Sequence, residues 1–287
     1  MCADNDAVTD DISVFDDKRA VTQGNELTRA AYSMSPSEKR LLMLAIAKVN
    51  PAYRLRDELN GLIRVQVTVQ EWKDLYGSKN PYPEMVRAAE SLQGISVTLN
   101  PFNDKKDRRR INLTDSCDYM EGEGRIVLVF GASMCKLLLR DFINQFTYFD
   151  LLSVNRLTST NAIRLYELLV QFRKTGRLSL TFDELRTLFQ TGDSYRDNGV
   201  FKRWVIEASI TQINQRTDIE VVYTTRKKGV RLHAVDFTFG AKQQPDLFQG
   251  AEAPKKNTRA ATRSTEDKRA SRKRVTAAVM NIQDTDW

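Results

Sequence analysis

The feature that most constrains the fold of this chain is a pattern of strand and helix signals that occurs twice. The two copies are "VQVTVQEWKDLY", from Val65 to Tyr76, and "LSLTFDELRTLF", from Leu178 to Phe189, and they align without a gap. In each copy, alternating apolar residues, which are typical of a half-buried strand, lead into the motif T-x-x-E. This motif is a capping box, in which both side chains accept hydrogen bonds from orphan backbone amides at a helix N-terminus. Each copy therefore predicts a strand that enters a short capped helix.

The elements around the two copies recur in the same order. A helix signal precedes the first copy, with Ser35 as N-cap, Pro36 at the first helical position and Glu38 at the third. An apolar helix pattern that stops at Gly176 precedes the second copy. Each copy is followed by another helical stretch and then by two strands around a basic turn.

Helix, strand, helix, helix and hairpin is the element order of a winged helix, whose third helix enters the DNA major groove while the hairpin, the wing, contacts the backbone. We therefore predict an α+β fold with two tandem winged-helix domains, at residues 25–148 and 149–240, the second being the main DNA-reading domain. The acidic segment 1–24 and the basic segment 241–287 have little apolar periodicity, so we expect disordered tails there.

Residue counts narrow the function classes. The chain has 44 Lys and Arg against 37 Asp and Glu, a formal net charge of +7, which favours a polyanionic partner such as double-stranded DNA. His233 is the one histidine, which excludes His-rich metal sites and nickases that hold a metal with two histidines, and its alternating strand context indicates a structural role. Neither a P-loop motif nor G-x-S-x-G occurs. We therefore expect no enzyme activity, no cofactor and no metal site.

The cysteines and the apolar runs indicate a cytosolic protein. Cys2, Cys117 and Cys135 are odd in number and form no C-x-x-C pair, so we expect reduced, apolar side chains rather than disulfides or a zinc site. The longest apolar run, from Leu41 to Ala47, is too short to cross a bilayer. The acidic start of the chain is unlike a secretory signal.

Basic residues gather at the tips of both predicted hairpins. The first tip carries Lys105, Lys106, Arg108, Arg109 and Arg110. The second carries Arg226, Lys227 and Lys228, with Arg231 on the returning strand. One basic loop alone is usually a solvated surface loop. Two such loops at equivalent positions of a repeat favour contact with DNA phosphates.

The helix expected near Val200 to Asn214 can be divided by its 3.6-residue period. Its inner side consists of Phe201, Val205 and Ala208, with Trp204 at the margin. Its outer side consists of Arg203, Glu207, Thr211 and Asn214, which Arg196 joins if the helix begins early.

Arg203 is the main candidate for base reading, because an outward arginine near the start of a recognition helix can donate to O6 and N7 of guanine. The alternative is that Arg203 and Glu207, four residues apart, form only a surface pair. In the first repeat, Arg87 is the one basic residue on the corresponding helix. This difference predicts that the first module contributes more backbone or protein contact than base reading.

Several segments resemble plasmid replication initiators that bind iterons. These are "NELTRAAYSMSPSEKRLLMLAIAKVNP", "NAIRLYELL" and the "INQRT" that precedes a predicted strand. The resemblance implies a bacterial cytoplasmic protein that binds repeated origin sequences as a monomer, opens the origin and recruits host replication proteins. It also implies a dimer, formed through the first domain, that represses its own promoter and so contributes to plasmid copy control.

The resemblance also assigns residues. Lys202 and Arg203 occupy the basic positions of the reading helix, whereas Trp204 stands where family members often have a third basic residue. Because the chain has no ATPase motif, origin opening must draw on multiple binding, DNA bending and supercoiling. Host proteins then load the helicase.

A short apolar motif, "QPDLF", lies in the basic tail. It resembles the peptide with which bacterial replication proteins bind the sliding clamp, and the implied contacts are Gln244, Asp246, Leu247 and Phe248. An extended peptide can place a Leu-Phe pair in a preformed apolar pocket. The alternative is that this pair packs onto the second winged helix.

Two other function classes are open from sequence. One is a winged-helix transcriptional repressor without a replication role, which would bind a lone palindrome rather than tandem repeats. The other is a nickase, which would cleave a DNA strand with a metal, and which the histidine count argues against.

Overall fold

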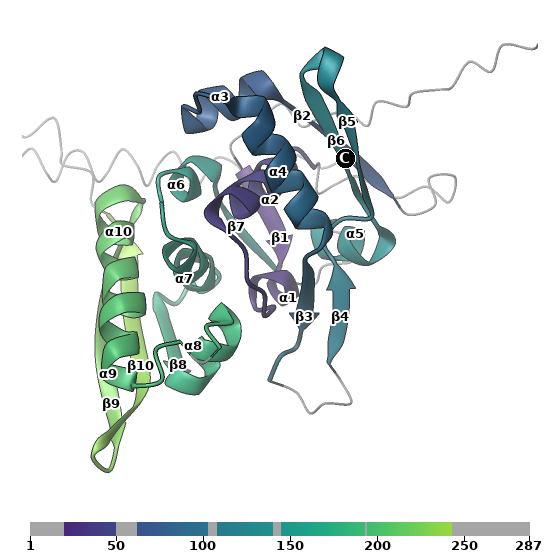
Figure 1. Cartoon of the computed structure of the whole chain (residues 1–287). Coiled ribbons are helices and arrows are strands. Elements are labelled where there is room, and N and C mark those ends of the chain that lie inside the picture. The colour runs from purple at the N-terminus through teal and green to yellow at the C-terminus, as the bar shows by residue number, and fades with distance from the viewer. Residues whose placement is uncertain (1–19, 50–61, 103–107, 140–144, 193, 243–287) are drawn as a thin grey trace, which may run out of the picture. The chain divides into compact units, whose positions relative to one another are not determined.

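The computed structural model describes residues 20–49, 62–102, 108–139, 145–192 and 194–242. Within these ranges, the order helix, strand, helix, helix and hairpin occurs twice, once in each half of the described chain (Figure 1). The predicted α+β fold with two winged-helix modules is therefore confirmed.

The first module contains the elements that its copy of the repeat predicts. These are α2 (Pro36–Ala47), β2 (Ile63–Thr68), α3 (Val69–Tyr76) and α4 (Pro81–Gln93). Capping boxes are present at Ser35 for α2 and at Thr68 for α3, as predicted. The first wing consists of β3 (Ser96–Leu99), which pairs antiparallel with β4 (Arg109–Asn112).

The first module also has strands that the repeat does not predict. β6 (Arg125–Phe130) pairs with β2 on one side and with β5 (Ser116–Met120) on the other. Ile126, Leu128 and Phe130 alternate along β6 and are fully buried, so this strand covers the core where a wing strand lies in the second module. The first wing is consequently a separate two-stranded sheet. The short helix α5 (Ala132–Leu138) follows β6.

The second module has the three-stranded sheet expected of a winged helix, in the order β8-β10-β9. Its helices are α7 (Thr160–Val170), α8 (Phe182–Phe189), α9 (Asn198–Phe201), the π-helical turn η4 (Lys202–Glu207) and α10 (Ala208–Arg216). Its strands are β8 (Arg177–Thr181), β9 (Ile219–Lys228) and β10 (Arg231–Ala241). The capping box of Thr181 is present at α8. Figure 1 shows α10 running beside the β9–β10 hairpin.

Gly176 marks the turn between α7 and β8. Its φ of +63° lies in the left-handed region that favours glycine. A Cβ atom there would lie 2.6 Å from the carbonyl oxygen of Phe239, so the close approach of β10 also requires glycine.

A strand at the start of the described chain corrects one prediction. β1 (Ala20–Gly24) pairs antiparallel with β7 (Phe146–Asp150), and α1 (Asn25–Thr28) and α6 (Leu151–Asn155) follow these strands. Disorder throughout residues 1–24 is therefore wrong for the last five of them, because Val21 is fully buried and the backbone pairs with β7. Residues 1–19 and 243–287 lie outside the described residues.

The described cysteines lie in the interior. Cys117 and Cys135 are buried and free, as predicted, and burial raises the pKa of each thiol to about 11. Cys2 lies outside the described residues. Within the described ranges, no cluster of His, Cys, Asp and Glu has the arrangement of a metal site. No helix in these ranges combines the length and apolar content needed to span a bilayer.

Candidate nucleic-acid interface

The recognition helix of the second module is a continuous helical segment from Asn198 to Arg216, made of α9, η4 and α10. Asp197 caps it by accepting a hydrogen bond from the amide of Val200 at 2.9 Å. The middle of the helix is a π turn, in which backbone hydrogen bonds join residues i and i+5. Such turns occur frequently at functional sites.

The π turn changes which residues face the core. Phe201 and Val205 are fully buried, as predicted, but Ala208 is exposed, so its predicted inner position is wrong. The wider turn rotates the following residues, and Ser209 takes the inner place instead. Trp204 is 59% exposed and therefore belongs to the outer face, not to the margin of the inner side as predicted.

The outer face has other polar contacts than the Arg203–Glu207 pair that was the alternative from sequence. Glu207 pairs with Lys202 at 3.3 Å and accepts a hydrogen bond from the Tyr223 hydroxyl. The hydrogen bond from Tyr223, aided by Lys202, lowers the pKa of Glu207. The guanidinium of Arg203 instead lies over the ring of Trp204, 5.6 Å from its centroid. Arg203 thus stays on the exposed face.

Asn214 departs from its predicted outward position. Its side chain donates to the carbonyl of Val221 at 2.9 Å and accepts from the Val221 amide at 2.7 Å. The side chain of Asn214 therefore attaches the recognition helix to β9. Arg196 is exposed just before the Asp197 cap, at the start of the helix.

The second wing is the tip of the β9–β10 hairpin, from Arg226 to Arg231. Lys227, Lys228 and Arg231 are exposed there, and their contact with DNA phosphates stays a prediction. Arg226 has a structural role that the sequence does not predict, since its guanidinium donates to Asp236 and to the Ser179 hydroxyl, each at 2.7 Å. These contacts join all three strands of the sheet.

The first wing is cationic where β4 begins, next to the segment that connects its two strands. Arg108, Arg109 and Arg110 are exposed; Arg109 donates to the Ser133 hydroxyl at 3.0 Å, and Arg110 donates to the Ser96 hydroxyl. Lys105 and Lys106 lie in segment 103–107, outside the described residues. Arg87 is exposed on α4, the equivalent of the recognition helix in the first module.

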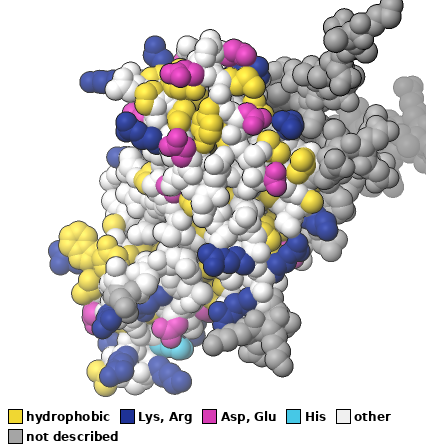
Figure 2. Space-filling view, turned by 45° about the vertical axis from the view of Figure 1, so that its right-hand side comes forward, with side chains coloured by type: hydrophobic (Ala, Val, Ile, Leu, Met, Phe, Trp, Pro, Cys, Tyr) yellow, Lys and Arg dark blue, Asp and Glu magenta, His cyan; other side chains and the backbone are white. Residues whose placement is uncertain are grey.

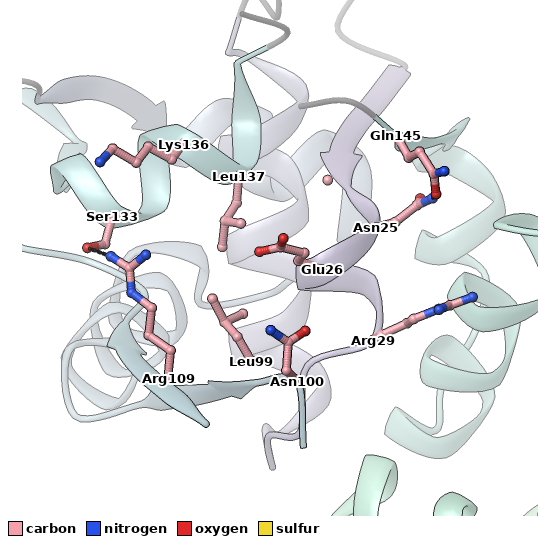
Figure 3. Close-up of a pocket in the computed structure, with 11 residues that line it drawn as sticks. Asn25, Glu26, Arg29, Leu99, Asn100, Arg109, Ser133, Lys136, Leu137 and Gln145 are labelled. Carbon is pink, nitrogen blue, oxygen red and sulfur yellow. Dashed lines mark hydrogen bonds between the residues drawn. The ribbon is translucent and has the colours of Figure 1, made fainter. Parts of the chain in front are cut away.

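A cleft of about 670 Å³ lies beside the first wing, between α1, α5, the end of β3 and the start of β4 (Figure 3). Leu99 and Leu137 point toward its centre, together with Glu26 and Asn100. The cations at its rim are Arg29, Arg109 and Lys136, which come from three different segments.

Sequence reasoning missed two of these cations. Lys136 lies on α5, and Arg29 follows α1 and donates to Gln171 at 3.2 Å. Arg29 is part of the segment "NELTRAAY" that carries the family resemblance, which was a signal that could have identified it. In the view of Figure 2, Lys and Arg side chains gather in the lower half of the face, where Asp and Glu are fewer.

Two winged-helix modules with basic outer elements define a tandem winged-helix protein. Residues 20–170 match the family model described as Initiator Replication protein, WH1, and residues 181–239 match that of Initiator Rep protein, WH2. The chain belongs to this family of replication initiator proteins, which confirms the predicted resemblance.

Two known proteins are similar to the chain over most of its length. A curated relative from Escherichia coli, named as an uncharacterized 27.6 kDa protein, is 25% identical over 226 residues, which are 76% of this chain and 94% of the relative. The solved structure of Pi initiator protein in complex with iteron DNA is 19% identical, with a TM-score of 0.66. That match covers 80% of this chain and 100% of the solved chain, and it supports the tandem fold.

Proposed function

We propose that this protein initiates plasmid replication by binding repeated origin sequences, the iterons, as a monomer. Bound copies promote origin opening and recruit host replication proteins, and a dimer represses the protein's own promoter and so contributes to copy control. The observation that carries the proposal is the match of both initiator modules to successive segments of one chain. The Pi initiator protein, which shares the fold, has been solved with iteron DNA, and this supports the same class of ligand.

The proposed DNA contacts follow from the basic residues of the two modules, of which Lys105 and Lys106 lie outside the described residues and Lys202 is partly buried. They are residues on or next to the two recognition helices and the two wings, namely Arg87, Lys105, Lys106, Arg108, Arg109, Arg110, Arg196, Lys202, Arg203, Lys227, Lys228 and Arg231. Arg226 was predicted with this group, but its bonds within the sheet favour a structural role. We assign base reading to residues 149–240, and dimerisation and backbone contact to residues 25–148.

A second candidate function is a winged-helix repressor with no role in replication. Footprinting on the DNA that flanks the coding region separates the two. Protection of tandem direct repeats supports the initiator, whereas protection of a lone palindrome supports the repressor. Strand cleavage in the presence of a divalent metal would support a nickase and contradict both.

The proposed recruitment of the host sliding clamp depends on Gln244, Asp246, Leu247 and Phe248, which lie outside the described residues. A Leu-Phe pair is the kind of anchor that a preformed apolar pocket binds. Pull-down of the clamp with the full chain should be lost with Leu247→Ala and Phe248→Ala. Unchanged capture would leave packing on the second module as the role of this peptide.

A further inference from the structure

The outer face of the recognition helix carries a row of exposed apolar side chains. Val200 is 44% exposed, Trp204 is 59% exposed, and Ala208 is also exposed. The three residues are spaced four apart, so they lie on one side of the helix in successive turns. The helix buries a separate set, which includes Phe201 and Val205, so the outer row does not serve the core. A large exposed indole in such a row indicates a binding surface.

The charged neighbours of this row have partners of their own. Lys202 pairs with Glu207, and the hydroxyl of Tyr223 donates to the same carboxylate, so both charges are partly compensated beside the row. Arg203 lies over the Trp204 ring, 5.6 Å from its centroid. The exposed surface therefore combines the Trp204 indole, the smaller apolar side chains of Val200 and Ala208, and one adjacent guanidinium.

This combination matches a particular pattern in the DNA major groove. The C5-methyl of thymine is the apolar group that base edges present there, and guanine presents the acceptors O6 and N7 to an arginine. We propose that Trp204, continued by Ala208, contacts thymine C5-methyl groups beside a guanine that Arg203 binds, and that it sets the base preference of this protein. The inference rests on the proposed function, because it requires the recognition helix to enter the major groove.

The test uses the DNA duplex that the footprint defines. In a second duplex, every thymine of the footprint is replaced by deoxyuridine, which removes only the C5-methyl groups. Dissociation constants are measured by fluorescence anisotropy for the full chain, for Trp204→Ala and for Trp204→Phe. A double-mutant cycle of protein and DNA then isolates the coupling between the indole and the methyl groups.

We expect the parent protein to bind the deoxyuridine duplex roughly fivefold to tenfold more weakly than the thymine duplex, because the apolar burial of the methyl groups is lost. Trp204→Ala should bind the thymine duplex more weakly than the parent protein does, by about the same factor. On the deoxyuridine duplex, the variant and the parent protein should have nearly equal affinities. Trp204→Phe should retain part of the preference for thymine. Tyr148→Ala is the matched control, because Tyr148 is 56% exposed on β7, and it should leave both constants unchanged.

Three outcomes would overturn the inference. Equal losses on both duplexes for Trp204→Ala would show that the indole and the methyl groups are not coupled. A parent protein that binds both duplexes equally would show that it does not read the methyl groups. Unchanged DNA binding with a changed oligomeric state in Trp204→Ala would assign the row to a protein partner.

Failure of the proposed function is seen separately, since the parent protein would then give no sequence-specific footprint on the natural DNA. Unchanged thermal unfolding and unchanged low-salt affinity for unrelated DNA show that a variant is folded.

Discussion

The ammonium nitrogen of Lys39 lies 2.8 Å from a carboxylate oxygen of Glu167, and both side chains are almost completely buried. The hydroxyl of Tyr32 accepts from Lys39 at 2.6 Å and from Arg164 at 2.9 Å, and donates to Glu167 at 3.1 Å. Arg164 also donates to the carbonyl of Ala30. Burial raises the pKa of Tyr32, so its hydroxyl remains a neutral member of the cluster. The cluster joins α7 to α2 and to the segment before α2, and it buries two cations with one carboxylate.

Glu167→Gln should destabilise the fold strongly, because it leaves Lys39 and Arg164 as buried cations without a counter-charge. Removal of one partner from a buried ion pair costs about 3–5 kcal/mol. The free energy of unfolding in urea measures this loss. Glu123→Gln is the control, because Glu123 pairs with Arg125 with its own side chain 57% exposed. The control should lose at most about 1 kcal/mol. Equal losses in the two variants would contradict a structural role for the buried charge.

The local elements could be predicted from sequence, whereas the cluster could not. The capping boxes of Thr68 and Thr181 formed as predicted, because a T-x-x-E motif and the helix that it starts are neighbours in sequence. Arg164 and Glu167 are three apart on a helix, a spacing that is typical of an exposed pair. Their burial depends on the segment around Tyr32, which is distant in sequence.

The outer face of the recognition helix was only partly predictable, for a related reason. A 3.6-residue period places Phe201 and Val205 correctly but places Ala208 inside. Nothing in the sequence "KRWVIE" marks the π turn that shifts the later residues of the helix. The pairing of β2 with β6 was likewise a long-range contact with no local signal.

Acid should destabilise the first module through Glu71. Burial alone would raise the pKa of this carboxyl, but hydrogen bonds from the Thr68 amide and from Lys48 outweigh burial and lower it. A lowered pKa in the folded state means that the stabilisation is present above the unfolded value of about 4.3 and is lost as pH falls through the folded value. The free energy of unfolding, measured between about pH 6 and pH 3, should therefore fall more steeply for the parent protein than for Glu71→Gln. Parallel curves would contradict this assignment.

Arg203→Ala should weaken specific DNA binding by about 1–3 kcal/mol and relax the preference for one base pair, if the guanidinium donates to guanine. Arg203→Lys should lose most of the same preference, because an ammonium cannot make the bidentate contact. Binding to a set of duplexes that differ at single positions measures both effects. A uniform loss across all these duplexes would instead assign Arg203 to the phosphate backbone.

The first wing should contribute to affinity without contributing to base preference. Neutralising Arg108, Arg109 and Arg110 together should flatten the dependence of log K on log salt by about 0.9 for each phosphate contact that is lost. The loss should be equal for specific and unrelated duplexes, because phosphates carry no sequence information. A salt slope equal to that of the parent would place this wing away from DNA.

The second wing offers a sharper comparison, because three adjacent cations have different surroundings. Lys227 and Lys228 are exposed at the tip, whereas Arg226 donates to Asp236 and Ser179 within the sheet. Lys227→Ala and Lys228→Ala should each reduce the slope of log K against log salt by about 1. Neither substitution should change the free energy of unfolding much. Arg226→Ala should keep the salt slope and lower the stability by at most about 1 kcal/mol, since its side chain is 59% exposed. A reduced slope in Arg226→Ala, with unchanged stability, would show that this guanidinium leaves Asp236 to bind phosphate.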